Sequence, residues 1–396
     1  MTGQILITDN RTFSPALFEI MKEISPAVDG LELYEFQYCL DNMTPAEGWD
    51  SVTLESLEVI ERKAQDRDYY AQIKISPKVD GKPVLDETVV HLTQMLFAGL
   101  VRGRYPVEWL KLWFYFDLRG FYFLYRTQYL TEEVVQHFGG APYRQFEMRQ
   151  KGFERAQAVG YQEFKAANAE VDARFFEIID RLIELHGTPV LVGIAGPTAA
   201  GKTEIVARLR ERYQKKGKQV SAFEMDHYFL DRDYREQTGF DSLGREALHF
   251  DLMQKDLHEL LAGRRITSPR YDFLTGASSH DLTDQLKPGA ETINVKPADI
   301  IFMEGNFPFL LPEIAELVAI KVVYLTDDDI RLKRKWRRDM DFRKKYELNY
   351  FRNRYFREQF MMAECAYIPQ LKCCDLAVDT SGARLWLTSE TAGRLK

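Results

Sequence analysis

The stretch "GPTAAGKT" at residues 196–203 contains the residue types and spacing that predict chemistry most directly. Small residues let a backbone wrap closely around a polyphosphate, which main-chain N–H groups and the start of a helix attract. We expect the ammonium group of Lys202 to reach the β- and γ-phosphates and the hydroxyl group of Thr203 to ligate Mg²⁺. The predicted nucleotide-binding loop consists of Gly196, Pro197, Thr198, Ala199, Ala200, Gly201, Lys202 and Thr203.

Two carboxylates follow predicted buried strands. Asp226 lies in "FEMDHYF" and Glu304 in "FMEG", each at the carboxyl end of its strand. In an open parallel sheet, ligands bind at that edge. We expect Asp226 to accept the proton of an attacking hydroxyl group and Glu304 to act as a second carboxylate beside the metal. Taken alone, each acid is also compatible with a helix cap or a solvated loop.

A strongly basic segment runs from Arg331 to Arg357, with twelve basic and three acidic residues, although the formal net charge of the chain is −7. The spacing of Arg331, Arg334 and Arg338 predicts one shared helix face. We expect these arginines to close over a triphosphate and to neutralise charge in the transition state. The alternatives are a solvated basic face and an RNA-binding surface, which the acidic remainder of the chain disfavours. The stacking residues of that surface would be Trp336, Tyr346, Tyr350 and Tyr355.

The elements that must position these side chains alternate between strand and helix after about residue 187. Short apolar runs are typical of strands covered on both faces, and helical patterns separate them. This alternation predicts an α/β fold of the P-loop NTPase type, with a parallel sheet flanked by helices. The predicted strands are 189–195, 220–225, 298–304, 319–325 and, as the last, 374–379, and the predicted helices are 202–215 and 246–262.

The first half of the chain has strand-rich, aromatic composition that predicts an α+β accessory domain. We expect strands at 4–10, 31–40 and 68–79, a helix at 85–102 and a hairpin at 110–130. A helical pattern over 143–186 stops at Gly187 and Pro189. The sequence thus predicts three parts: residues 1–142 as the accessory domain, 143–187 as a helical connector and 188–396 as the nucleotide-binding domain.

Composition indicates a globular protein, since 45% of the 396 residues are hydrophobic and 29% are charged. No apolar run reaches the roughly 18 residues of a membrane span, and the first ten residues lack the pattern of a secretory signal. The four cysteines, two of them adjacent at Cys373 and Cys374, suit neither a metal knuckle nor an easy disulfide. We therefore expect free thiols in the cytoplasm, no membrane or nucleic-acid partner, and leave a homo-oligomer open.

The half of the chain from about residue 188 to 382 resembles the uridine kinase and phosphoribulokinase family of P-loop kinases. The stretches that fall in the family order are "GPTAAGKT", "MDHYF", "GFDSLGREALHFD", "SPRYDFLTG", "ADIIFMEG", "DDDIRLKRKWRRDM" and "EQFMMAECAYIPQLKCCDLAVD". This resemblance implies a phosphotransferase that moves the γ-phosphate of ATP to the hydroxyl group of a small molecule with the help of Mg²⁺. GTP is the alternative donor.

The resemblance also implies roles for individual residues. Asp226 corresponds to the catalytic base, while Arg334 and Arg338 match the arginines near the lid and act with Lys202 on the phosphates. The implied acceptor-binding residues are Asp241 in "GFDS", Tyr271 in "PRYDF" and Phe229.

Three departures from the uridine kinase pattern concern the acceptor. Gly276 stands where uridine kinases have a histidine that helps to hold the pyrimidine, Phe229 replaces a common tyrosine, and the "FDSLGREALHFD" segment is longer. A pyrimidine nucleoside, uridine or cytidine, is the first expectation. The alternatives are a sugar, a sugar phosphate or a small hydroxy-acid as acceptor, or a regulatory module that senses nucleotide.

Overall fold

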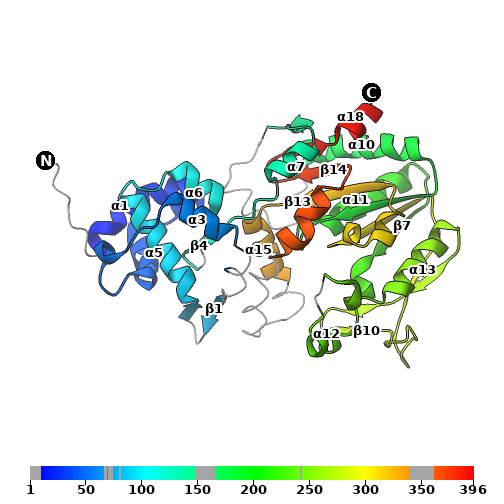
Figure 1. The fold of residues 1–396 in the computed structure, drawn as a ribbon, viewed down its shortest axis with the longest axis horizontal. Helices are drawn as coiled ribbons and strands as arrows, with labels where there is room; N and C mark the ends of the chain where they lie inside the picture. Colours follow the sequence, from blue (N-terminus) through cyan, green and yellow to red (C-terminus); the bar gives the residue numbers. More distant parts are fainter. Residues whose placement is uncertain are drawn as a thin grey trace.

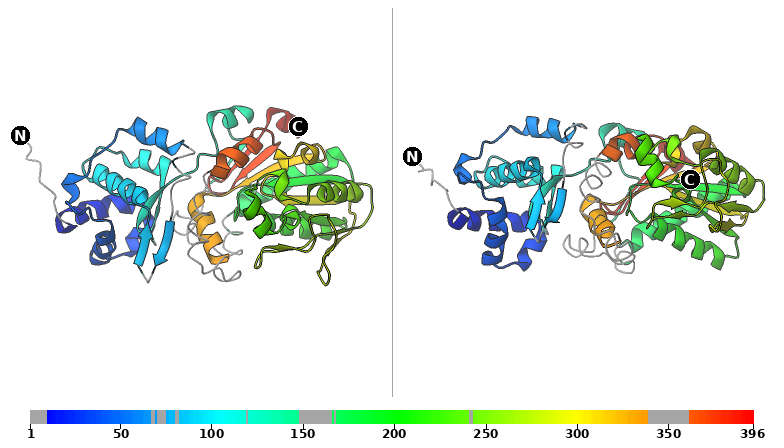
Figure 2. Two further views of the ribbon diagram at one scale, coloured as in Figure 1. Left: turned by 60° about the horizontal axis from the view of Figure 1, so that its bottom comes forward. Right: turned by 90° about the horizontal axis from the view of Figure 1, so that it is seen from below.

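Helix α15 (Asp328–Arg337) lies between the two main parts of the molecule (Figure 1). The amino-terminal helices lie on one side of it and a seven-stranded sheet with its helices on the other, in both views of Figure 2. The computed structural model describes residues 10–66, 69, 75–79, 82–118, 120–147, 166, 168–240, 243–338 and 361–396.

The amino-terminal part is built around helix α5 (Glu87–Val101). This helix begins at Asp86, whose carboxylate accepts a hydrogen bond from Thr88 N at 2.9 Å, as an N-cap residue should. Its apolar side chains enter a core rich in aromatic rings, in which Phe13 stacks on Trp49. The other elements are α1 (Asn10–Ile24), η1 (Pro26–Gly30), α2 (Leu33–Leu40), η2 (Asp41–Met43), η3 (Trp49–Ser51), α3 (Leu57–Ala64), β1 (Ile75–Val79), β2 (Lys82–Leu85), α6 (Val107–Trp113), β3 (Phe114–Asp117) and β4 (Tyr122–Tyr125).

The large sheet has the strand order β5-β15-β14-β13-β6-β12-β7. The strands from β14 to β7 are parallel, and the antiparallel strands β15 and β5 complete one edge. Every residue of β6 and β12 is buried, which explains why their sequences are apolar apart from Glu304 and the glycines. The strands are β5 (Arg144–Gln145), β6 (Val190–Ala195), β7 (Val220–Glu224), β12 (Ile300–Gly305), β13 (Ile320–Leu325), β14 (Leu376–Asp379) and β15 (Arg384–Leu387).

Helices pack on both faces of this sheet. Helices α10 (Ala169–His186) and α11 (Lys202–Lys215) join the core on one face, and α13 (Phe250–Leu261) joins the core on the other. Helix α10 ends where Gly187 adopts a φ of 77°, a conformation that favours glycine. The remaining elements are α7 (Glu132–His137), η4 (Met225–Tyr228), α12 (Arg232–Thr238), η5 (Arg245–Ala247), β8 (Ile266–Ser268), β9 (Tyr271–Asp272), β10 (Ala277–Ser278), β11 (Ile293–Val295), η6 (Pro308–Leu310), α14 (Pro312–Ala315), η9 (Ala363–Tyr367), α17 (Ile368–Leu371) and α18 (Ser389–Arg394).

The predicted fold class is confirmed, and so is the helix at 85–102. The hairpin predicted at 110–130 is confirmed over 114–125, where β3 pairs with β4, but residues 110–113 belong to helix α6. Three element predictions are wrong. The segment 31–40 forms helix α2 instead of a strand, β5 interrupts the predicted helical stretch at 144–145, and β15 follows the strand predicted to be the last. The predicted strand at 4–10 lies almost wholly outside the described residues.

The predicted domain limits at residues 142 and 187 stay predictions. The structure places Tyr129, Val134 and Phe138 in the hydrophobic core on one face of the sheet, together with Trp386. Among the helices of the described ranges, none has both the length and the apolar character needed to cross a membrane. The four cysteines are free thiols, as predicted.

Candidate active site

The predicted phosphate loop leaves the central strand β6 and leads directly into helix α11. Gly196 has a φ of +150°, and a Cβ atom at this position would lie 2.2 Å from Tyr324 O on the neighbouring strand β13. Gly201 has a φ of 103° and is the N-cap residue of α11. Both positions therefore require glycine, and the loop presents its N–H groups at the start of a helix, where an anion is stabilised.

The side chain of Lys202 folds back onto this loop. Its Nζ atom donates hydrogen bonds to Gly196 O at 2.8 Å and to Pro197 O at 3.0 Å. A third bond reaches Asn306 Oδ1 at 3.0 Å. Burial lowers the pKa of Lys202 to about 8, although the attraction of nearby carboxylates opposes the change. The ammonium group is thus held at the mouth of the loop by neutral oxygen atoms, which a phosphate can replace.

Glu304 is the next-to-last residue of strand β12, and Asp226 lies in the turn η4 that follows the neighbouring strand β7. Glu304 Oε1 accepts a hydrogen bond from Thr203 Oγ1 at 3.0 Å. Within the described ranges, the buried atoms Glu304 Oε2 and Asp226 Oδ1 have no hydrogen-bond partner. Burial, reinforced by repulsion from Glu224, raises the pKa of Glu304 to about 7. Burial also raises the pKa of Asp226, against the attraction of Lys202.

Three arginines of the basic segment face the phosphate loop, as their spacing predicts. Arg331 Nη1 donates to Thr198 O at 3.3 Å and Arg334 Nη1 to Ala199 O at 3.2 Å. Arg338 Nη2 donates to Thr198 Oγ1 at 3.1 Å. Burial lowers the pKa of Arg334 to about 10. The structure therefore gathers positive charge on the loop that is predicted to hold a triphosphate. Residues 339–360, which include most of the basic segment, lie outside the described residues.

Two of the predicted acceptor-binding residues lie together on the side of Asp226. The rings of Phe229 and Tyr271 meet edge to face, with 6.0 Å between their centroids. The buried guanidinium group of Arg235 joins them, because Nη2 donates to Tyr271 Oη at 3.0 Å and the group lies 4.8 Å from the Phe229 centroid. The third predicted residue, Asp241, lies outside the described residues.

Gly276, which we predict to stand where uridine kinases have a histidine, has a φ of +80°. A Cβ atom there would lie 2.7 Å from Arg232 Cζ, and the carbonyl group of Gly276 accepts a hydrogen bond from Arg232 N at 2.8 Å. Arg232 therefore occupies the space that a side chain at position 276 would need.

Tyr228 anchors the turn that carries Asp226 to the core. This tyrosine is fully buried and stacks on Phe223, with 5.0 Å between ring centroids. Its hydroxyl group donates to Asp256 Oδ2 of helix α13 at 2.6 Å. Burial raises the pKa of Asp256 to about 6. The position of the candidate base thus depends on a buried polar contact with the helix layer.

The carboxylates and hydroxyl group of the site suit Mg²⁺ in its complex with a nucleotide. In the described part of the chain, no group of three or more His, Cys, Asp or Glu residues could hold a metal ion by itself. Magnesium characteristically binds to one or two carboxylates, with phosphate oxygens and water completing its shell. Thr203 and Glu304, with its unpartnered buried oxygen, fit this requirement. We expect the ion to be held there only together with phosphate.

Sequence reasoning missed Asn306, whose amide oxygen holds Lys202. Gln370 fixes the main chain there, because its Nε2 donates to Asn306 O at 2.9 Å and its Oε1 accepts from Phe309 N at 3.1 Å. The position was within reach of the sequence, since Asn306 follows Glu304 by two residues at the ligand-binding edge of the sheet.

The strand–loop–helix phosphate site and the carboxylates at the same sheet edge define a P-loop nucleotide-binding fold. Residues 191–385 match the model of the phosphoribulokinase / uridine kinase family. A uridine kinase of Bacillus cytotoxicus is 32% identical over 157 residues, which are 38% of this chain and 68% of that relative. The chain belongs to the phosphoribulokinase / uridine kinase family, as its motifs suggested.

Two further similarities concern the same half of the chain. A uridine kinase of Lactobacillus helveticus is 33% identical over 160 residues, covering 38% of this chain and 68% of that relative. Among solved structures, a possible uridine kinase of Bacillus stearothermophilus is 20% identical, covers 51% of this chain and all of its own, and has a TM-score of 0.35.

Proposed function

We propose that this protein is a kinase that transfers the γ-phosphate of ATP, bound with Mg²⁺, to a hydroxyl group of a pyrimidine nucleoside. The observation that carries the proposal is the buried, unpartnered Oδ1 atom of Asp226 at the sheet edge that also carries the phosphate loop and Lys202. A buried carboxylate with a raised pKa is a better proton acceptor near neutral pH than a solvated one.

In the proposed reaction, Asp226 takes the proton of the acceptor hydroxyl group, while the oxygen of that hydroxyl group forms a bond to the γ-phosphorus. The bond between the γ-phosphorus and the β–γ bridging oxygen breaks, and ADP leaves with the electron pair. Bound Mg²⁺ neutralises phosphate charge. Lys202, Arg334 and Arg338 contribute positive charge around the phosphates, and burial strengthens their effect because the local dielectric constant is low.

The choice of a nucleoside rests on the similarity to uridine kinases and on the aromatic pair Phe229 and Tyr271, against which a base or ribose can pack. A second candidate acceptor is a small molecule that carries a phosphate or carboxylate group. The observation that favours it is the pair of cations Arg232 and Arg235, one of which occupies the place of the uridine kinase histidine.

A coupled ADP-release assay over uridine, cytidine, pentose phosphates, glycerate and pantothenate tests the acceptor. Release with nucleosides alone supports the first candidate, and release with the anionic acceptors alone supports the second. If no acceptor stimulates ADP release although ATP binds, the kinase proposal is wrong and a nucleotide-sensing module replaces it.

The variant Asp226→Asn tests the base. We expect kcat to fall by about 10²–10⁴-fold, the usual contribution of general base catalysis, while the Kd for ATP stays unchanged. Asp233→Asn, at an exposed carboxylate of helix α12, is the matched control and should leave both constants unchanged. An Asp226→Asn protein with wild-type turnover would remove Asp226 from the mechanism.

A further inference from the structure

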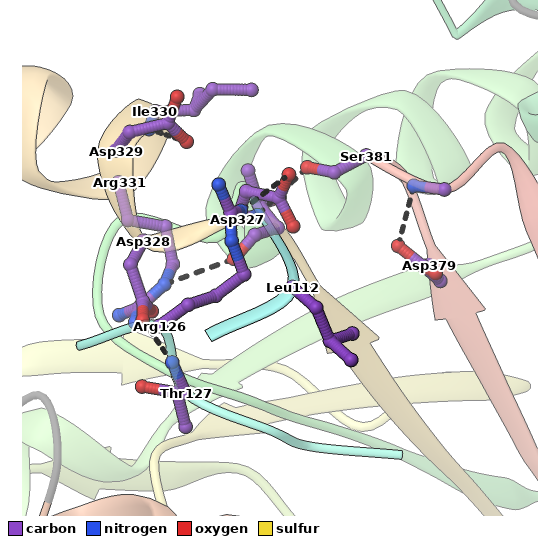
Figure 3. A network of polar contacts seen from close by, with 12 residues as sticks. Leu112, Arg126, Thr127, Asp327, Asp328, Asp329, Ile330, Arg331, Asp379 and Ser381 are labelled. Carbon is purple, nitrogen blue, oxygen red and sulfur yellow. Dashed lines mark hydrogen bonds and ion pairs between the residues drawn. The ribbon is translucent and has the colours of Figure 1, made fainter. Parts of the chain in front are cut away.

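Residues 126–129, named here the crossing segment, lead the chain out of strand β4 and past the start of helix α15 (Figure 3). Arg126 Nη1 lies 3.4 Å from Asp327 Oδ2. Thr127 N donates a hydrogen bond to Asp328 Oδ2 at 2.9 Å. The crossing segment therefore contacts the N-cap residue of α15, Asp327, and its first residue, Asp328.

One guanidinium group extends these contacts to the phosphate loop. Tyr129 Oη accepts a hydrogen bond from Arg331 Nη2 at 2.7 Å and lies 3.3 Å from Asp328 Oδ1, to which it donates. Arg331 Nη2 also forms an ion pair with Asp328, and each of these two side chains is 1% exposed. The other end of the same group, Nη1, donates to Thr198 O in the phosphate loop. The planar guanidinium group of Arg331 thus joins Tyr129 to the phosphate loop.

The amino-terminal part fixes both the crossing segment and the helix. Arg126 N donates to Trp113 O at 2.7 Å, and Gln128 Nε2 donates to Leu112 O at 2.6 Å. On α15 itself, Leu332 follows Arg331 and is buried in the aromatic core of the amino-terminal part. The helix whose arginines face the phosphate loop therefore takes its position from the amino-terminal part as well as from the sheet.

A buried ion pair adds little net stability, because desolvation of both groups offsets their attraction. Such a pair instead restricts geometry, since each buried charge must keep its partners. Tyr129 and Thr127 supply partners to both members of this pair, since Thr127 N and Tyr129 Oη donate to Asp328 and Tyr129 Oη accepts from Arg331. The same orientation places Arg334 and Arg338, one and two turns further along, against the loop.

We propose that Tyr129 is a positioning residue. Together with Asp328 it orients Arg331, while Arg126 holds the start of α15, and the arginine face of this helix is thereby kept on the phosphate loop. The amino-terminal part is then required for phosphoryl transfer through this contact, without touching the substrate. This inference rests on the proposed kinase function for its kinetic consequence, but not for its structural one.

The variant Tyr129→Phe removes only the hydroxyl group that Arg331 and Asp328 share. Tyr105→Phe is the matched control, because Tyr105 is also buried and its hydroxyl group donates to Glu55 O at 2.9 Å inside the amino-terminal part. We expect Tyr129→Phe to lower kcat/KM for ATP by at least about tenfold, because it removes the hydrogen bonds of this hydroxyl group with two charged partners, Arg331 and Asp328. Amide hydrogen exchange should become faster in residues 327–337 and 196–203. Tyr105→Phe should change neither quantity.

Asp328→Asn provides a second variant, since it keeps the side-chain volume but removes the charge that faces Arg331. It should reproduce both effects. The positioning role is overturned if neither Tyr129→Phe nor Tyr105→Phe changes kcat/KM or the amide exchange rates. It is also overturned if both variants change these quantities equally, which would indicate a general loss of stability. If the wild-type protein transfers phosphate to no acceptor, the proposed function fails, while the exchange comparison still decides whether Tyr129 positions α15.

Discussion

The pH dependence of stability offers a direct test of the contact that anchors the candidate base. Asp256 accepts a hydrogen bond from Tyr228, which lies two residues beyond Asp226 in the same turn. Burial raises the pKa of Asp256 from 3.8 to about 6 in the folded protein. Below both values the carboxyl group is protonated in the folded and the unfolded chain, and no penalty arises. As the pH rises, the unfolded chain ionises first, so the free energy of unfolding falls until the folded state also ionises near pH 6.

The variant Asp256→Asn keeps the shape and an acceptor for Tyr228 but cannot ionise. A pKa of about 6 in place of 3.8 corresponds to about 3 kcal/mol of lost stability above the window. Screening by solvent reduces this figure, and part of the loss has already occurred at about pH 4.5, so we expect about 1–2 kcal/mol between about pH 4.5 and 7.5. The variant should therefore gain this much stability relative to the wild type as the pH rises through the interval.

Urea unfolding of both proteins at several pH values measures this difference. Asp272→Asn is the control, because the pKa of Asp272 is shifted in the opposite direction. Hydrogen bonds from Leu274 N and Thr275 Oγ1 help to lower it. The stabilisation by Asp272 is lost only below about pH 4, so the difference in unfolding free energy between Asp272→Asn and the wild type should stay constant in the measured interval. If the stability difference for Asp256→Asn is equally constant, burial does not raise the pKa of this carboxyl group in the folded protein.

Two further predictions concern the phosphate loop. Lys202→Ala should weaken ATP binding by at least about tenfold, measured by isothermal titration with Mg²⁺, because a charge-assisted contact contributes about 1.5–3 kcal/mol; unchanged affinity would mean that the loop does not hold the triphosphate. Gly196→Ala should abolish ATP binding, since its Cβ atom would meet Tyr324 O at 2.2 Å, whereas Gly393→Ala, which meets no atom within 4 Å, should bind normally. Normal binding by both glycine variants would contradict the required loop geometry.

The nucleotide-binding half could be predicted from sequence because its central strands are buried on both faces. Short apolar runs such as 190–195 and 300–303, alternating with helical patterns, are typical of strands in a covered parallel sheet. Strand β15 was missed since its four residues pair antiparallel with β14 after a tight turn, a pattern that the βα rhythm does not predict.

Composition misled in the amino-terminal part. The segment 31–40 contains residues typical of strands, but Glu32 and Glu35 form a reciprocal capping box that starts helix α2. Only Phe36 and Leu40 of this helix are buried, and their spacing of four residues is the helical signal. Local capping and tertiary burial outweighed the intrinsic strand preference of the aromatic residues.

In the site, the residues predicted from motifs are those whose chemistry depends on local sequence. The loop 196–203, Glu304 and the arginine face of α15 come together because each follows a strand at one sheet edge. The roles of Asn306 and Tyr129 depend on contacts across long stretches of chain, to Lys202 and Arg331. The sequence places Asn306 at the ligand-binding edge, two residues after Glu304, but no local pattern predicts which side chains Asn306 and Tyr129 contact.

The sheet edge formed by β5 and β15 has a practical consequence for the expression of the nucleotide-binding half alone. Strand β5 comes from upstream of α10 and pairs with β15, while Phe138 covers Trp386 with 6.0 Å between ring centroids. A fragment that starts at residue 188 would bare an indole ring and open a strand edge, both of which invite aggregation. A fragment that keeps β5 and Phe138, together with Tyr129 of the same core, has to begin before the crossing segment.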